Sequence, residues 1–196
     1  MIIKKANAQA ISFACKNFHY AKCVPAVTHG YNIYNAENEW CGVICFGVGA
    51  NRNLAKEFGF VAGEVLELER VALNGKQEYT SQAVAMALKK LHEENPLVKM
   101  IVSYADHRQH HIGTIYQATN WIYLGKSMNA NVQYFYNGKW THKRSIDARK
   151  DGNELKKILP TRSASNKFKY LFVFDKRLRK KYLKMALPYP KDKDLT

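Results

Sequence analysis

The sequence predicts an α/β fold with a central mixed sheet flanked by helices, and three observations carry this prediction. Strand-like and helix-like apolar segments follow one another in the order strand, strand, helix, strand, helix, strand. The length of 196 residues suits one globular domain. Apolar residues make up 46% of the chain, which is too many for a disordered basic protein.

The first half of the chain supplies two strands and a long helix. Trp40 to Val48 is an apolar run with glycines, as in a buried strand, and Val65 to Leu73 alternates in polarity like a second strand. A helix begins near Thr80 or Ser81, either of which can cap it, and runs to about His92. Its apolar residues have the spacing of one buried face: Val84, Ala87, Leu88 and Leu91.

The second half continues the alternation. Val98 to Ser103 is expected to be a strand, and Gly113 to Trp121 has helical spacing. Two short strands around Asn137-Gly138 predict a hairpin, because this dipeptide favours a tight turn. A β-branched and aromatic run, Lys169 to Phe174, predicts a further strand, and a short helix is expected at Arg177 to Lys184.

The positive charge is concentrated at one end. Lys and Arg total 31 against 16 Asp and Glu, and the excess of 15 divides into +3 for residues 1–138 and +12 for residues 139–196. We therefore expect residues 1–138 to form a catalytic core, continued without a linker by a basic extension, residues 139–196. The extension is expected to add strands and a DNA-contacting surface, with a merely solvated basic face as the alternative.

Several classes of protein are excluded by absent features. No stretch of about 18 apolar residues could span a membrane, and no secretion signal is visible, so we expect a cytoplasmic protein with its four cysteines reduced and buried. The chain lacks a P-loop, the motifs of adenine methyltransferases, the zinc-deaminase signature and the nucleophile elbow of α/β-hydrolases.

Two charged residues of the core are candidates for chemistry. In a regular strand Arg70 would share the apolar face of Leu66 and Leu68, where a lone guanidinium is costly. Asp106 follows directly after a central strand, a common place for active-site groups in open sheets. The two residues either pair only with each other or also line a pocket.

The segment from Ser103 to Gly125 resembles the Mom family of bacteriophage DNA-modification proteins. The similarity lies in Ser-Tyr-Ala-Asp at the strand end, in the His-x-Gly step, and in Ile-Tyr-Gln-Ala-x-x-Trp-x-Tyr-x-Gly. Glu69 to Leu73 also fits, so the resemblance covers residues 65–125 well and extends more weakly back to His29.

The resemblance implies a fold similar to the GCN5-related N-acetyltransferases, with a mainly antiparallel mixed sheet. It implies a transferase that converts adenine N6 in double-stranded phage DNA to a carbamoylmethyl derivative in the host cytoplasm, which hides the DNA from restriction enzymes. Acyl-CoA enzymes of that fold bind pyrophosphate with a glycine-rich loop. Asn74 to Ser81 lacks that pattern, so the donor is left open between acetyl-CoA and an aminoacyl-tRNA.

Roles in this chemistry are assigned to particular residues. Asp106 accepts a proton or orients the N6 amine, and Arg70 grips an anionic part of the donor or holds Asp106. Tyr116 serves as a general acid, and Ser81 faces the donor or only caps its helix. His29 and Tyr31 are expected in a glycine-containing loop over the active site.

Two further sets of residues complete the prediction. His29, Asp106 and Tyr116 could hold a non-haem metal such as iron. A flipped base needs an apolar slot, for which Tyr116, Trp121 and Tyr123 are candidates. The alternative is that these rings only pack in the core.

Binding of DNA phosphates is assigned to cations of the last helix: Arg177, Arg179, Lys180 and Lys181.

Two other functions remain open at this point. One is an ordinary acyl-CoA-dependent N-acetyltransferase acting on a small amine or a protein, and the other is a DNA-binding protein without catalysis. The oligomeric state is also open, with a homodimer among the alternatives.

Overall fold

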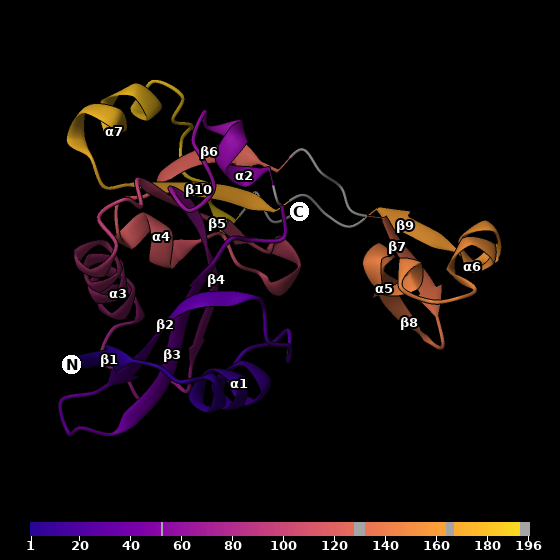
Figure 1. Cartoon of the computed structure of the whole chain (residues 1–196), viewed down its shortest axis with the longest axis horizontal. Helices are drawn as coiled ribbons and strands as arrows, with labels where there is room; N and C mark the ends of the chain where they lie inside the picture. The colour runs from indigo at the N-terminus through magenta and orange to yellow at the C-terminus, as the bar shows by residue number, and fades with distance from the viewer. Residues whose placement is uncertain (52, 128–131, 164–166, 193–196) are drawn as a thin grey trace.

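The computed structural model describes residues 1–51, 53–127, 132–163 and 167–192. Its main feature is a seven-stranded sheet in the order β1-β2-β3-β4-β5-β10-β6, drawn in Figure 1. These strands are β1 (Ile2–Lys5), β2 (Val27–Tyr34), β3 (Trp40–Gly47), β4 (Val65–Leu73), β5 (Met100–Ala105), β10 (Phe168–Val173) and β6 (Ile122–Lys126).

The sheet is mixed and mainly antiparallel, as predicted. Five of its neighbouring pairs are antiparallel, and β4 and β5 alone among the pairs of this sheet run parallel. The parallel step arises because the chain crosses over through a helix between β4 and β5, which returns it to the starting edge.

Helices cover both faces of this sheet (Figure 1). One face packs against α3 (Thr80–Glu94) and α4 (Thr114–Ala118), and the other against α1 (Ala8–Asn17), α2 (Leu54–Glu57) and α7 (Lys176–Leu183). A short 3₁₀ turn, His107–Gln109, follows β5. The layered α/β architecture expected from the element order is therefore confirmed.

The long helix α3 shows how well periodicity predicts a buried face. Ala83, Val84, Ala87, Leu88 and Leu91 are all buried against the sheet. Its start differs in detail from the expectation, because the N-cap residue is the extended Tyr79 and neither Thr80 nor Ser81 caps it. Thr80 instead accepts a hydrogen bond from the side chain of Gln77 at 2.9 Å.

A second, smaller sheet has the strand order β8-β7-β9. It is formed by β7 (Val132–Tyr136), β8 (Lys139–His142) and β9 (Thr161–Ser163), with the helices α5 (Lys143–Asp147) and α6 (Gly152–Ile158). We call residues 132–163 the small lobe, drawn in orange in Figure 1. The boundary expected after Gly138 lies in the turn between the paired strands β7 and β8. Gly138 is therefore inside the small sheet and does not separate it from the large sheet.

The small lobe lies between two strands that pair with each other in the large sheet. Lys126 at the end of β6 is opposite Phe168 at the start of β10. The pairing continues one residue further, where the Ser127 amide donates to the Lys167 carbonyl oxygen at 2.7 Å. The small lobe is therefore inserted at the tip of an antiparallel hairpin, and β10 belongs to the core.

The described helices were also compared with the dimensions of a bilayer. Within residues 1–51, 53–127, 132–163 and 167–192, none has the length and apolar character that a membrane-crossing helix needs.

Candidate active site

The strands β4 and β5 separate partway along their length, and the candidate site is built around this opening. They pair only from Val65 to Glu67 with Met100 to Val102. Beyond that point the Ser103 hydroxyl bridges the gap, lying 3.1 Å from the Leu68 carbonyl oxygen and 2.8 Å from the Tyr116 hydroxyl. The Leu68 carbonyl oxygen therefore accepts its hydrogen bond from a side chain of β5 at this point.

A bulge in β4 turns Arg70 to the other face of the sheet. Cys45 pairs with Arg70 but the next residue of β3, Phe46, pairs with Leu68, so Glu69 is an extra residue. The expectation that Arg70 shares the face of Leu66 and Leu68 is therefore wrong. Side-chain alternation assumes a regular strand, and one extra residue reverses it.

Arg70 lies among polar groups near α1. One terminal nitrogen donates to the Glu69 carbonyl oxygen at 2.6 Å, and the other lies 3.4 Å from the Cys23 sulfur. Its Nε is buried and has no hydrogen-bond partner among the described residues. The guanidinium therefore places a positive charge beside the site, and this charge lowers the pKa of neighbouring acids and of His19.

Two carboxylates of β4 have raised pKa values. Burial raises the pKa of Glu67 to about 7, helped by the charge of Glu69, while Lys167 and Arg70 oppose the shift. Burial also raises the pKa of Glu69, which accepts a hydrogen bond from the Gly49 amide at 3.1 Å. A carboxyl that titrates near neutral pH can take up a proton, so Glu67 is a candidate general base that the sequence did not indicate.

Asp106 lies where β5 ends, as expected. Its carboxylate forms an ion pair with Lys167 at 3.9 Å, and its side chain is 18% exposed. The charge of Asp106 also raises the pKa of Tyr20, whose main cause is burial. A carboxylate is chemically able to accept a hydrogen bond from an amine.

Tyr116 is buried on the other side of the opening. Its ring lies 5.0 Å from the rings of Trp121 and Tyr170, and burial raises its pKa to about 12. The hydroxyl therefore stays protonated at neutral pH, in the electrostatic range of Glu67 and Tyr20. Gly113 makes this packing possible: its φ is +82°, and a Cβ there would lie 2.5 Å from the Tyr170 ring.

His29 and Tyr31 lie on the strand β2, so their expected position in a loop is wrong. The glycine at position 30 suggested a loop, yet Gly30 is an ordinary strand residue whose missing side chain makes room for Ile11. His29 contacts Asn95 at 3.1 Å, and the Tyr31 hydroxyl donates to Glu94 at 3.0 Å, both at the end of α3.

The residues near Arg70 and Asp106 come instead from the loop between α1 and β2, residues 18–26. The rings of His19 and Tyr20 stack at 4.3 Å, and Tyr20 contacts His111 edge-on at 5.9 Å. Burial, followed by the charges of Arg70, His111 and Lys167, lowers the pKa of His19 to about 4. The sequence of this loop has no periodicity that would predict its position. The only sequence signal for a functional role was that His19 and the aromatic Tyr20 are adjacent.

The three residues proposed as metal ligands do not fit a metal ion in this arrangement. His29 uses its two ring nitrogens with Thr28 and Asn95, and Tyr116 is held protonated by burial. In the part of the chain that the structure describes, no three His, Cys, Asp or Glu side chains are grouped as metal ligands. These residues therefore do not form an iron site in this arrangement.

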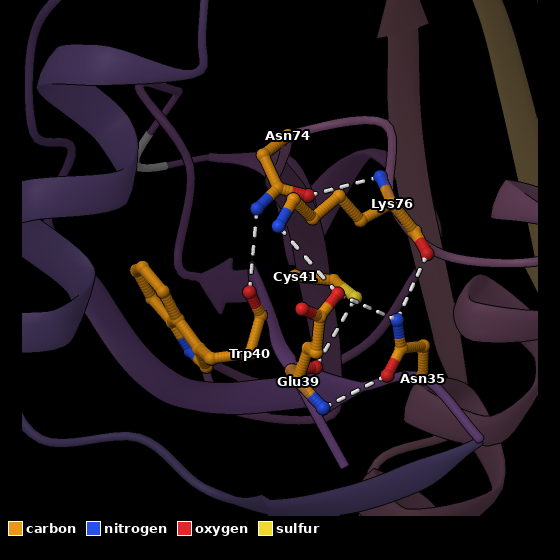
Figure 2. A network of polar contacts seen from close by, with 6 residues as sticks. All are labelled: Asn35, Glu39, Trp40, Cys41, Asn74 and Lys76. Atoms are coloured by element: carbon orange, nitrogen blue, oxygen red, sulfur yellow. Dashed lines mark hydrogen bonds and ion pairs between the residues drawn. The ribbon is translucent and has the colours of Figure 1, made fainter. Parts of the chain in front are cut away.

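The loop before α3 is fixed by side chains, as Figure 2 shows. Asn35 donates to the Lys76 carbonyl oxygen at 3.3 Å, Asn74 donates to the Trp40 carbonyl oxygen at 3.3 Å, and Lys76 pairs with Glu39 at 3.5 Å. Ser81 lies half-buried in the first turn of α3, where its contact with a donor remains a prediction.

The residues assigned to DNA divide into buried and exposed groups. Trp121 is fully buried and Tyr123 nearly so, so both rings pack in the core, which was the stated alternative to a base slot. On α7, Arg177, Lys180 and Lys181 are exposed, and Arg179 donates to the Asn120 carbonyl oxygen at 2.6 Å. The role of these cations in DNA binding stays a prediction.

Comparison with known proteins agrees with the fold and the motif. The model of the Mom protein family matches residues 1–191. The chain belongs to the Mom protein family. A relative from Escherichia phage Mu, the methylcarbamoylase Mom, is 28% identical over 163 residues, covering 76% of this chain and 67% of its own.

Solved structures confirm the acetyltransferase-like fold. A variant of the spermidine N-acetyltransferase from Vibrio cholerae has a TM-score of 0.52, 9% identity, and coverage of 92% of this chain and 99% of its own. A protein provisionally identified as a phosphinothricin N-acetyltransferase gives 0.52 at 8% identity, covering 89% and 99%. At this identity the similarity concerns the fold alone.

Proposed function

We propose that this Mom-family protein is a DNA-modifying transferase that converts adenine N6 to a carbamoylmethyl derivative and so protects phage DNA from host restriction. The observation that carries the proposal is the opening between β4 and β5. There Glu67 lies within electrostatic range of Tyr116 and of Lys167, and Lys167 pairs with Asp106. The relation to the methylcarbamoylase of phage Mu supports the type of group transferred.

The residues of the opening supply the proton transfers that this reaction needs. The N6 amine is a poor nucleophile, so it loses a proton as its nitrogen bonds to the acyl carbon of the donor and the bond from that carbon to the carrier breaks. A glycyl group transferred in this way contains the same atoms as a carbamoylmethyl group, so an isomerisation of the attached group completes the reaction. Glu67, with a pKa of about 7, accepts this proton, and Asp106 accepts a hydrogen bond that orients the amine. Tyr116, protonated because its pKa is about 12, donates to the departing group.

The donor is proposed by class only. Arg70 holds its anionic part, because the guanidinium lies beside the opening and remains charged. The loop before α3 lacks glycines at the pyrophosphate positions and is held by Asn35 and Asn74. This arrangement favours an aminoacyl-tRNA over acetyl-CoA, and binding of the two by the purified protein distinguishes them.

Mass spectrometry of nucleosides tests the proposal. DNA from bacteria that express the protein is digested, and a deoxyadenosine with a carbamoylmethyl-sized addition is expected. Unaltered nucleosides alongside folded protein refute it and leave a DNA-binding protein without catalysis. Acetylation of polyamines or proteins in the same cells would favour an ordinary N-acetyltransferase.

Variants of two site residues test the assignment of roles. We expect Asp106→Asn and Tyr116→Phe each to lower the modified fraction about 100-fold or more while DNA binding persists. Full modification by both variants would show that the site lies elsewhere. Sedimentation of the wild-type protein distinguishes a monomer from a homodimer in the same preparations.

A further inference from the structure

Within residues 132–163, the packing of α5 is on one face of the small sheet. The helix α5 packs on β7 and β8, and Tyr134 and Ile146 are buried on that side. Side chains alternate along a strand, so the intervening residues lie on the opposite side. We call this side the open face; its residues are Gln133, Phe135, Trp140, His142 and Arg162.

The open face carries a preformed group of flat side chains. Phe135 is opposite Trp140 in the register, and their rings lie 5.2 Å apart. The Arg162 guanidinium lies 4.4 Å above the Trp140 ring, and its Nε donates to the Gln133 side-chain oxygen at 2.9 Å. These contacts fix the rings and the guanidinium in place before any partner binds, which lowers the entropy cost of binding.

This group is partly exposed although it contains apolar rings, with Trp140 and Gln133 half-buried. Phe135 is 40% exposed, and Arg162 is exposed as well. Across residues 132–163, eight Lys and Arg accompany three Asp and Glu, so the small lobe is positively charged. Rings attract flat apolar partners and cations attract anions, so the partner must combine both properties.

Nucleic acid combines these properties. Bases stack on aromatic rings and on guanidinium planes, and Arg and Gln are the side chains that hydrogen-bond guanine and adenine edges. An acidic peptide would use the charge but leave the Phe135–Trp140 pair without a role. An anionic membrane would use the charge and the rings but offers no base edge to the Gln133 amide.

We propose that the open face of the small lobe binds nucleobases of the DNA substrate and selects the sequence around the modified adenine. This inference rests on the proposed function for the identity of the substrate as DNA. It assigns sequence selection to a lobe whose chain connection to the core runs through the β6–β10 hairpin.

Two arginines of the small lobe form a matched pair for the test. Arg162 covers Trp140 on the open face, whereas Arg149 covers Tyr136 at 4.6 Å on the α5 side. Arg162→Gln and Arg149→Gln each remove one positive charge and one ring contact from the full-length protein. Fluorescence anisotropy then measures binding to a set of duplex DNAs with varied sequence, to single-stranded DNA and to RNA.

We expect Arg162→Gln to weaken binding of the preferred DNA about fivefold or more and to reduce the spread of affinities among sequences. Arg149→Gln is expected to lower all affinities by about twofold or less. Preference for single-stranded over duplex DNA would identify stacked unpaired bases as the ligand, and preference for duplex would identify groove contacts. Both results support the proposal, provided that they depend on Arg162.

A second pair tests the ring contacts without changing charge. Phe135 on the open face and Ile158 on α6, which is 76% exposed, are both accessible apolar residues. We expect Phe135→Ser to weaken DNA binding about fivefold or more and Ile158→Ser to leave it unchanged. Circular dichroism of both variants confirms that the small lobe remains folded.

Three results would overturn the inference. These are equal losses for both arginine variants at every sequence, tighter Arg162-dependent binding of RNA than DNA, and Arg162-dependent binding of phosphatidylserine vesicles that exceeds binding of DNA. Mass spectrometry of nucleosides detects the modification, and mass spectrometry of oligonucleotides gives its sequence context; together they separate this failure from failure of the proposed function. If the Arg162→Gln variant modifies DNA to the wild-type level and in the same sequence context, only the inference is refuted. If DNA binding depends on Arg162 but no modified nucleoside is found, only the proposed function is refuted.

Discussion

The core and the small lobe are stabilised in different ways. In the core, buried side chains from all seven strands except β1 pack between the sheet and its helices. In residues 132–163 as described, the buried hydrophobic side chains are Tyr134 and Ile146. The small lobe relies on ring–guanidinium contacts at its surface instead, such as those of Arg149 and Arg162.

This difference indicates where rigidity and recognition are located. Burial of large apolar side chains holds the opening between β4 and β5 in one geometry, as proton transfer requires. A small unit with few buried side chains is close to the limit of stability, so a ligand that binds it adds a large fraction of its stability. We therefore expect DNA that binds the small lobe to raise the free energy of unfolding of this lobe by a large fraction.

The largest expected effect contrasts two tryptophans. Trp121 is fully buried between Tyr116 and Phe172, so Trp121→Ala should lower the free energy of unfolding by about 3–5 kcal/mol. Trp140 lies on the open face, and Trp140→Ala should change the unfolding of the core by less than about 1 kcal/mol. Urea unfolding followed by far-UV circular dichroism measures both. Equal costs would mean that core and small lobe unfold as one unit.

The next effect sharpens the comparison within the core. The pKa of Glu67 is raised from 4.5 to about 7, so the folded state binds a proton more tightly than the unfolded chain. Stability from this residue is complete below pH 4.5 and is lost as pH rises through 7, by on the order of 3 kcal/mol. Urea midpoints of Glu67→Gln should lack this decline.

Glu93 provides the control for that measurement. It lies exposed on α3 and pairs with Lys89 at 3.9 Å, so Glu93→Gln should keep the wild-type pH dependence. The same burial predicts that the reaction rate rises toward a plateau above pH 7, where Glu67 is deprotonated and can accept a proton. A rate that is flat from pH 6 to 8 would remove Glu67 as the base.

The smallest expected effect concerns the cations of α7, which belongs to the core. Neutralising Arg177, Lys180 and Lys181 together should reduce the slope of log affinity against log salt by about 3, because each phosphate contact releases counterions. Sequence preference should be unchanged, since phosphate contacts carry no base information. Titration of duplex DNA at several salt concentrations measures both quantities.

Neutral substitutions elsewhere provide the comparison for that result. Lys4, Lys16 and Lys89 are exposed on other elements of the core, and their triple Gln variant should keep the wild-type slope. If both triple variants lose the same slope, the binding reflects net charge and α7 has no special place in it.

Local signals predicted more of this molecule than long-range ones. The strand Val65–Leu73, the helix face of α3 and the β7–β8 hairpin were all visible, because each depends on the spacing of neighbouring residues. The strand β10 was also predicted, but its position between β5 and β6 was not, because it depends on pairing across the inserted small lobe.

The candidate site divides in the same way. Asp106 was predicted from its position at a strand end, and Tyr116 from the motif around it. Glu67 was missed because a raised pKa depends on burial by residues far along the chain. Arg70 was predicted on the wrong face of the sheet because the prediction assumed regular alternation of side chains. The bulge at Glu69 interrupts that alternation.

The hairpin position of the small lobe has a consequence for how such proteins diversify. Paired strands lie about 4.8 Å apart, so the chain leaves β6 and re-enters β10 at almost the same point. Any folded module whose own termini are close together can replace residues 128–166 without changing the pairing of Lys126 with Phe168. A transferase built in this way can exchange its target-reading part by recombination of a single gene segment while its reaction chemistry is inherited unchanged.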